Sequence, residues 1–432
     1  MSNRLSPRKF PYLLGVLLLL TPYSLSMKAM RSLANPFLEF SQSPAALSAE
    51  CPDTEFASLL TQSTNTYTFD HYDVQTEDGP IIALFRIRLS GEGLAQLPEN
   101  QKANAQRPIL LQHGLTSCAD AWFLNGQKGS IGFHLADQGY DVWAGNNRGN
   151  KYSKKHRNPN VTEADFWNFS FAEMGQYDLP ANYRKILEFY PKGQKIFYVG
   201  HSQGTSQMFA AGSMPETRDF FAASTEMVIA IEPIAYMIHT DEKIASWFSG
   251  LGSVVNNVAR FMNINEILTS SCGGNPTWNK VVVWACDHMG FLCNMGWDIS
   301  GYDTNVDNVI KNMGDFLRHN PNGASVQSMA HYSQLISAKK PTFAKYDWGA
   351  AKNSQLYGQD TPTDYDMSTF NVPLVIARGT TDNLSTSGNL GDLLQKIGTA
   401  PVKIFTLEGW NHHTFEIPVH PELIFDIIDE QL

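Results

Sequence analysis

The sequence predicts an α/β fold in which helices flank both faces of a mostly parallel β-sheet, with a largely helical insertion. Three observations lead to this prediction. Short segments that are apolar at every position alternate with helical segments, as in strands buried on both faces. A hairpin pattern precedes them, and Gly200-His201-Ser202-Gln203-Gly204 stands between a predicted strand and a predicted helix. The 432 residues, 43% of them apolar, are sufficient for one large core.

The first part of the predicted core begins with a hairpin, because two alternating or apolar segments flank the turn Glu77-Asp78-Gly79-Pro80. Strands are predicted at 67–74, 81–87, 108–112, 141–144, 196–199 and 226–231. Helices are predicted at 130–138, 178–190 and 206–211. Ser130 and Asp178 are the expected N-caps, and Pro180 suits the first turn of its helix.

The alternation of strands and helices stops between residues 234 and 366, where apolar helical segments are separated by Gly, Asn and Pro. We therefore predict a core in two parts, 50–233 and 367–432, around an insertion at 234–366. The second part contains predicted strands at 372–377 and 402–407, and predicted helices at 390–397 and 421–431.

The N-terminus has the layout of a secretory signal peptide. Three basic residues precede the apolar run 12–20, and small residues follow it. We assign residues 1–49 to this signal and its leader and predict a soluble mature chain. An uncleaved signal anchor is the alternative. Entry into the secretory pathway permits disulfides among the five cysteines and glycosylation at the sequons of Asn160 and Asn168.

The charge pattern argues against nucleic-acid binding, because the formal net charge is −10 and no Lys/Arg cluster is present. The cysteine spacings match no zinc pattern. We predict no metal and no cofactor.

Ser202 is the predicted nucleophile. In a strand–turn–helix context, Gly-x-Ser-x-Gly forms a sharp turn that exposes the serine hydroxyl at the N-terminus of a helix. The same five-residue pattern also occurs by chance, so the assignment requires an acid, a base and an oxyanion site elsewhere in the chain.

The predicted acid and base follow the last two strands. Asp382 follows the strand at 372–377, and His412 and His413 follow the strand at 402–407. The order Ser, Asp, His is that of α/β-hydrolases. Asp382 could instead be a simple turn residue. His412 is favoured over His413 as the base.

An oxyanion site needs two backbone N–H donors. One is expected at Gln203, directly after the nucleophile. The other is expected at Leu115, in the loop His113-Gly114-Leu115 after an early strand. We interpret His113 as a hydrogen-bonding residue of this loop.

From about residue 60 to its end, the chain resembles the acid lipase family of gastric and lysosomal lipases. The matching segments are Thr76–Gly79, Leu111–Leu115, Asp141–Asn150, Tyr177–Ala181, Tyr198–Thr205, Ala324–Gln327, Phe343–Gly349 and Asn411-His412. The resemblance implies the triad Ser202, Asp382 and His412, the oxyanion donors Leu115 and Gln203, and a cap with a movable lid.

Some positions differ from the family pattern. Leu384-Ser385-Thr386 replaces the usual Leu-Ala-Asp after the acid, and His413-Thr414-Phe415 replaces Leu-Asp-Phe after the base. The cysteine spacing in the cap also differs, so Cys272–Cys286 is the preferred disulfide among several pairings. The sequon at Asn383 lies beside Asp382 and is not expected to be glycosylated.

The resemblance implies a serine lipase that hydrolyses triacylglycerols or cholesteryl esters, in a secreted or lysosome-like location. Its expected partner is the lipid ester at an oil–water or membrane interface, without an obligate protein partner. Two alternatives remain: a serine esterase or acyltransferase for shorter or more polar acyl groups, and a catalytically silent lipid carrier.

Overall fold

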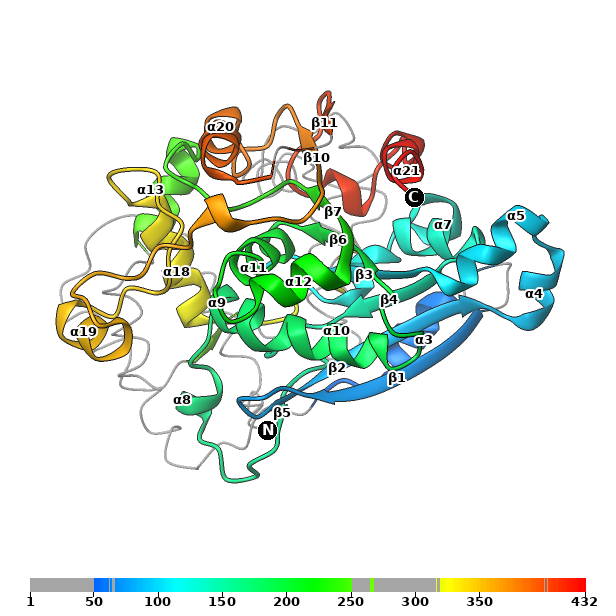
Figure 1. Cartoon of the computed structure of the whole chain (residues 1–432), viewed down its shortest axis with the longest axis horizontal. Coiled ribbons are helices and arrows are strands. Elements are labelled where there is room, and N and C mark those ends of the chain that lie inside the picture. Colours follow the sequence, from blue (N-terminus) through cyan, green and yellow to red (C-terminus); the bar gives the residue numbers. More distant parts are fainter. Residues whose placement is uncertain are drawn as a thin grey trace, which may run out of the picture.

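The computed structural model describes residues 50–61, 63, 67–250, 265–267, 316, 319–399, 401 and 403–432. Within this part of the chain, a nine-stranded sheet has the order β1-β2-β4-β3-β6-β7-β10-β11, and β5 pairs with β2. Figure 1 shows this sheet crossing the molecule behind α10, α11 and α12. The strands are β1 Tyr67–Gln75, β2 Pro80–Leu89, β3 Pro108–Gln112, β4 Asp141–Gly145, β5 Lys155–His156, β6 Ile196–His201, β7 Thr225–Ile231, β10 Leu374–Gly379 and β11 Lys403–Leu407.

The predicted α/β class is confirmed. From β4 to β11 all neighbouring strands are parallel, and the hairpin β1–β2 joins β4 in antiparallel orientation. The parallel strands inside the sheet, from β4 to β10, are largely buried on both faces, which explains their continuous apolar sequences, whereas the edge strand β11 is mostly exposed. All predicted core strands are present, and no end is shifted by more than two residues.

Helices cover both faces of the sheet, and alternate strand residues point into two separate apolar clusters. Leu110, Tyr198 and Val228 pack with residues of α10, α11 and α12 on one face. Ile109, Val199 and others pack with residues of α3, α7 and α21 on the other. The bounds are α3 Thr54–Leu60, α7 Ile131–Asp137, α10 Leu179–Leu187, α11 Gln203–Ala211, α12 Arg218–Ser224 and α21 Glu422–Asp429.

The described part of the insertion contributes helices at one end of the sheet (Figure 1). They are α13 Glu242–Gly250, α18 Val326–Ile336 and α19 Ala350–Tyr357, and a short two-stranded sheet joins β8 Glu266–Ile267 to β9 Ala324–Ser325. Most of 251–318, with Cys272 and Cys286, lies outside the described residues, as do residues 1–49. No described helix has both the length and the apolar composition needed to span a bilayer.

The remaining described α-helices are five short ones in connecting segments and the ten-residue α20 between β10 and β11. They are α4 Gly91–Gln96, α5 Glu99–Lys102, α6 Gly126–Gly129, α8 Glu163–Phe166, α9 Phe171–Glu173 and α20 Ser387–Lys396. A π-helical turn at Met174–Asp178 connects α9 to α10.

Both predicted N-cap positions are confirmed, but neither side chain makes a capping hydrogen bond. Ser130 stands at the N-cap of α7, but its side chain makes no capping hydrogen bond. Asp178 has helical backbone angles and continues from the π-helical turn. Its carboxylate accepts from Arg148 instead, because a charged donor competes successfully with a backbone N–H. α10 also ends at Leu187 rather than at Tyr190.

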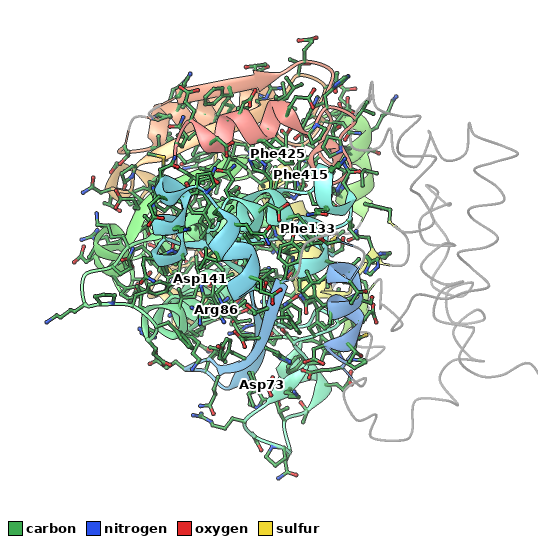
Figure 2. The ribbon with its side chains drawn as sticks, turned by 90° about the vertical axis from the view of Figure 1, so that its right-hand side faces the viewer. Asp73, Arg86, Phe133, Asp141, Phe415 and Phe425 are labelled. Atoms are coloured by element: carbon green, nitrogen blue, oxygen red, sulfur yellow. The ribbon has the colours of Figure 1, made fainter. Side chains whose placement is uncertain are left out.

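A buried ion pair joins the hairpin to the parallel part of the sheet. Figure 2 shows Arg86 of β2 next to Asp141 of β4. The Arg86 guanidinium donates to both carboxylate oxygens, with a shortest distance of 2.6 Å between Nη2 and Oδ2. Both side chains are nearly inaccessible to solvent. Burial of this kind makes the loss of one partner costly, since the other charge then remains unpaired.

We predict that Arg86→Ala lowers the free energy of unfolding by about 3–5 kcal/mol, because it leaves the Asp141 carboxylate buried without its cation. Urea-induced unfolding measures the change. Arg88→Ala is the matched control, since Arg88 lies two residues along the same strand and its pair with Asp70 is exposed. We expect the control to lose less than about 1 kcal/mol. Equal losses in the two variants would contradict the prediction.

Candidate active site

Ser202 lies in a sharp turn between β6 and α11. Its backbone angles are φ 52° and ψ −117°, a conformation that costs a non-glycine residue about 1–3 kcal/mol. The neighbouring glycines are required by close packing. A Cβ at Gly204 would lie 2.3 Å from the Gln112 carbonyl oxygen, and one at Gly200 would lie 2.7 Å from the Tyr198 ring. The turn therefore holds the serine hydroxyl clear of the sheet and beside the N-terminus of α11.

Ser202, His412 and Asp382 form a continuous chain of hydrogen bonds. The distance from Ser202 Oγ to His412 Nε2 is 2.7 Å, and that from His412 Nδ1 to Asp382 Oδ2 is also 2.7 Å. An ionised Asp382 can only accept, so Nδ1 carries the proton and Nε2 accepts from the serine. All three side chains are buried, which strengthens these interactions by excluding water.

Asp382 is both a turn residue and the partner of His412. Its Oδ1 accepts from the backbone N–H groups of Leu384 and Ser385, at 2.6 and 2.9 Å. Burial raises the pKa of this carboxyl, but the charge and hydrogen bond of His412 outweigh burial and hold the pKa below its usual range. The carboxylate is therefore both oriented and ionised.

The structure brings His412, and not His413, to the serine. His413 turns toward Glu416, with 3.2 Å between Nδ1 and Oε1. The backbone at His412 is fixed by His201, whose Nε2–H donates to the His412 carbonyl oxygen at 2.8 Å. Burial and the neighbouring histidines lower the pKa of His201 far below its ordinary value, so His201 acts as a neutral donor.

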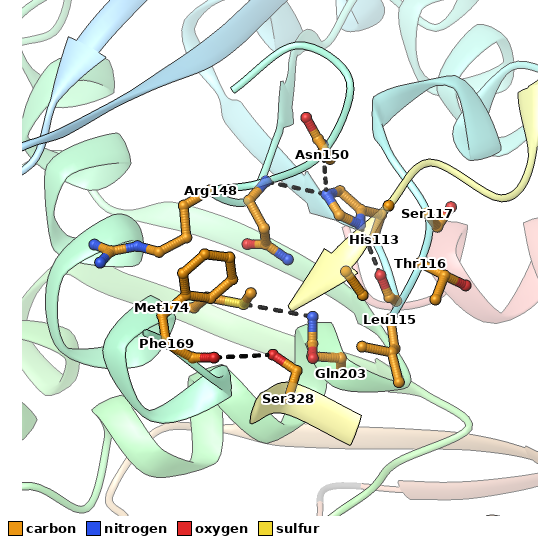
Figure 3. A pocket seen from close by; sticks show the side chains of 14 residues that line it. His113, Leu115, Thr116, Ser117, Arg148, Asn150, Phe169, Met174, Gln203 and Ser328 are labelled. Carbon is orange, nitrogen blue, oxygen red and sulfur yellow. Dashed lines mark hydrogen bonds between the residues drawn. The ribbon is translucent and has the colours of Figure 1, made fainter. Parts of the chain in front are cut away.

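The two residues predicted to supply the oxyanion donors, Leu115 and Gln203, line one small pocket. Leu115 and Gln203 line it with Phe169, Met174 and Ser328, and Figure 3 shows their side chains converging from separate segments. Among the hydrogen bonds of the described residues, neither the Leu115 nor the Gln203 backbone N–H has an acceptor. Both N–H groups are therefore unengaged within the described chain, which an oxyanion donor requires.

His113 fixes the loop that carries Leu115. Its Nδ1 lies 2.8 Å from the Gly114 carbonyl oxygen, and its Nε2 accepts from the Asn147 backbone N–H at 3.1 Å. Complete burial lowers the pKa of His113 to about 4. It is a neutral structural group of the loop, as the sequence analysis expects.

Arg148 connects three of the sequence motifs that are far apart along the chain. Its guanidinium is buried and pairs with Asp78 at 2.5 Å and with Asp178 at 2.6 Å. The Arg148 backbone N–H also donates to Asp178 at 3.0 Å. These contacts attach the β1–β2 turn and the start of α10 to the loop after β4, which lines the pocket.

Two groups of described residues have ligand atoms spaced closely enough for a metal ion. In the group of Glu55, Asp120 and His319, the Lys151 ammonium lies 2.5 Å from each carboxylate, so a cation already occupies that position. In the other group, Glu232, Asp382 and His412, the imidazole nitrogen is bonded to Asp382. Neither arrangement favours a metal.

Glu232 is a site residue that the sequence analysis missed. It directly follows β7 and is almost completely buried beside Asp382. The rule that selected Asp382, a polar residue at the carboxyl end of a buried strand, also applies to Glu232.

Other predicted residues lie away from this constellation. Asn160 and Asn168 are exposed. Cys51 forms a disulfide, and Cys118 is a buried free thiol. The preferred pair Cys272–Cys286 stays a prediction.

Comparison with known proteins decides the family. A family model for the alpha/beta hydrolase fold matches residues 107–417, and one for a partial alpha/beta-hydrolase lipase region matches residues 61–126. Human lipase member J is 33% identical over 84% of this chain and 95% of its own length. The chain belongs to the acid lipase family of α/β-hydrolases. Human gastric triacylglycerol lipase is 34% identical over 77% of this chain and 79% of its own.

Two further proteins are similar to this chain, one in sequence and one in structure. Human lysosomal acid lipase/cholesteryl ester hydrolase is 33% identical over 80% of this chain and 82% of its own. Among solved structures, a soluble variant of the Saccharomyces cerevisiae monoglyceride lipase has a TM-score of 0.51 at 14% identity, and the match covers 86% of this chain and 96% of that one. This structural similarity supports the fold alone.

We predict that His412→Gln slows labelling of Ser202 by a fluorophosphonate probe by about 10³-fold or more, because the hydroxyl loses its proton acceptor. Mass spectrometry of the labelled serine peptide measures the rate. His413→Gln is the matched control and should label at the wild-type rate. Slower labelling in the control than in His412→Gln would show that the two histidines have been assigned in the wrong order.

Proposed function

We propose that this acid lipase family member is a serine lipase that hydrolyses carboxylic esters of neutral lipids through an acyl-enzyme on Ser202. The observation that carries the proposal is the Ser202–His412–Asp382 hydrogen-bond chain beside two unengaged N–H donors. The names of the relatives support the substrate class, since they include a triacylglycerol lipase and a cholesteryl ester hydrolase.

The geometry supports a two-step reaction. Ser202 Oγ attacks the ester carbonyl carbon while His412 Nε2 takes the hydroxyl proton, and the N–H groups of Leu115 and Gln203 stabilise the oxyanion. The bond to the alcohol oxygen then breaks, and His412 returns the proton to the leaving alcohol. In the second step His412 takes a proton from water, which attacks the acyl carbon; the bond to Ser202 Oγ then breaks, His412 returns the proton to Ser202 Oγ, and the fatty acid is released. Asp382 stabilises the imidazolium in both steps.

A water-insoluble substrate would also explain why the chain has a long insertion between the two parts of its core. Residues 234–366 would form a cap over the site, since a water-insoluble ester requires an apolar groove that the enzyme should not leave exposed. Leu115, Phe169 and Met174 are apolar side chains in the lining of the pocket beside the site, among polar ones such as Asn147 and Gln203. We further propose that residues 1–49 direct the chain into the secretory pathway, where Asn160 and Asn168 would be accessible to glycosylation.

We predict that Ser202→Ala lowers kcat for triacylglycerol hydrolysis by about 10⁴-fold or more, since the nucleophile is lost while the remainder of the site stays intact. Fatty-acid release at pH 5 and pH 7 measures it. Ser58→Ala, on the exposed face of α3, is the control and should retain full activity. Unchanged hydrolysis by Ser202→Ala would exclude the proposed mechanism.

A chain-length series distinguishes a lipase from an esterase or acyltransferase of the same fold. We expect kcat/KM to increase from short to long acyl esters, because each buried methylene contributes about 0.8 kcal/mol. The hydrolysis of p-nitrophenyl esters, followed by triacylglycerol and cholesteryl ester emulsions, measures this. A maximum at acetate or butyrate, with no hydrolysis of emulsions, would favour the esterase.

A further inference from the structure

Glu232 places a second carboxyl group at the catalytic acid. It follows β7, the strand that lies between β6 and β10 in the sheet, so the strand ends at Ser202, Glu232 and Asp382 are neighbours. The side chain is 1% exposed. A carboxylate oxygen of Glu232, a carboxylate oxygen of Asp382 and a ring nitrogen of His412 all lie within 4.8 Å of one another.

The backbone of Glu232 has a conformation that residues other than glycine rarely adopt. Its φ is 47°, in the left-handed region, which is sterically unfavourable for any residue with a Cβ. The Glu232 N–H donates to the Ala377 carbonyl oxygen at 2.9 Å, which attaches this turn to β10. Strain of this kind persists only where the surrounding structure enforces it.

One oxygen of the Glu232 carboxyl is fixed by a glycine. Oε1 accepts from the Gly379 backbone N–H at 2.6 Å. Gly379 permits this approach because a Cβ there would lie 2.1 Å from the Trp410 carbonyl oxygen and 2.9 Å from Oε1 itself. The carboxyl therefore cannot rotate freely, and its second oxygen has a defined direction.

The second oxygen, Oε2, is buried and has no hydrogen-bond partner within the part of the chain that the structure describes. A carboxylate oxygen without a donor is costly in such a place, whereas a protonated oxygen can donate to an acceptor. The carboxylate of Asp382 is the adjacent acceptor, and it is already oriented by Leu384 and Ser385.

Of the two neighbouring carboxyl groups, Glu232 and Asp382, the surroundings favour a proton on Glu232. Burial and the adjacent Asp382 charge raise the pKa of Glu232 well above its ordinary value. His412 lowers the pKa of Asp382 instead. The other charged group that acts on Glu232 is Arg378, which favours ionisation more weakly than burial opposes it, and whose Nε donates to the Ser385 carbonyl oxygen at 2.7 Å.

We propose that Glu232 is a positioning residue of the catalytic acid: its neutral carboxyl donates Oε2–H to Asp382 and keeps that carboxylate ionised and aimed at His412 in acidic solution. The inference rests on the triad of the proposed function and adds a fourth member to it. Glu232 acts through Asp382 and does not touch the substrate.

A hydrogen bond to the charged form of Asp382 has a defined effect on the pH profile. It makes the carboxylate harder to protonate and weakens its attraction for a proton on the imidazole. Both effects extend the acid limb of kcat/KM toward lower pH. Loss of the donor should therefore move the acid limb to higher pH. An ionised Glu232 would also move the limb to higher pH than a neutral Glu232 does, because its negative charge stabilises a proton on His412.

The test compares Glu232→Gln with Glu232→Leu. Glutamine can accept from Gly379 and donate to Asp382 but cannot ionise, so the acid limb should stay within about 0.2 pH unit of wild type. Leucine has similar bulk and no donor, so the limb should move upward by about 0.5 unit or more, with kcat lowered. Both are measured as kcat/KM for a soluble ester between pH 3 and pH 8, with thermal unfolding to verify folding.

Two results would overturn the proposal. A downward shift of the acid limb in Glu232→Gln would show that Glu232 is ionised in the wild-type enzyme. Identical profiles in all three proteins would show that it only fills space.

A second readout does not require activity. The infrared difference spectrum between wild type and Glu232→Gln at pH 6 should contain the carbonyl band of one neutral carboxylic acid, and its absence would also overturn the proposal. If wild type hydrolyses no ester, the proposed function fails, whereas the infrared result still decides the protonation of Glu232.

Discussion

The active site depends on the turn at Ser202, where the chain leaves β6 and enters α11 with a positive φ. Gly204 permits the close packing of this turn against β3, and Gly200 leaves room for the Tyr198 ring. The strain has a structural consequence: it directs the serine hydroxyl toward the ends of the neighbouring strands. Because β6, β7, β10 and β11 are adjacent and parallel, the residues after them meet at one edge of the sheet.

Charge compensation in a buried environment is the second constraint. The Arg148 guanidinium pairs with Asp78 and Asp178, and Asp382 accepts two backbone N–H groups besides His412. His113 and His201 are kept neutral by burial and act as fixed hydrogen-bonding groups. Glu232 fits the same rule, since a neutral carboxyl beside Asp382 avoids a second buried negative charge.

The sequence predicted the strands and the three members of the hydrogen-bond chain because both follow local rules. Buried strands have continuous apolar runs, and polar residues directly after them reach one edge. The choice between His412 and His413 depends on how the loop after β11 is held by His201, which no local pattern reveals. Asp178 was expected to form a capping hydrogen bond because the sequence does not show that Arg148 competes for its carboxylate. Glu232 also follows a buried strand, but the strand-end rule does not show that its carboxyl group lies beside that of Asp382.

The most direct test of this account is a structure of the enzyme after reaction with a long-chain phosphonate ester, which imitates the tetrahedral intermediate. We predict phosphorus bonded to Ser202 Oγ, and a phosphonyl oxygen about 2.7–3.1 Å from the backbone nitrogens of Leu115 and Gln203. His412 should remain bonded to Asp382. A phosphonate attached elsewhere, or an oxygen directed away from both nitrogens, would contradict the account.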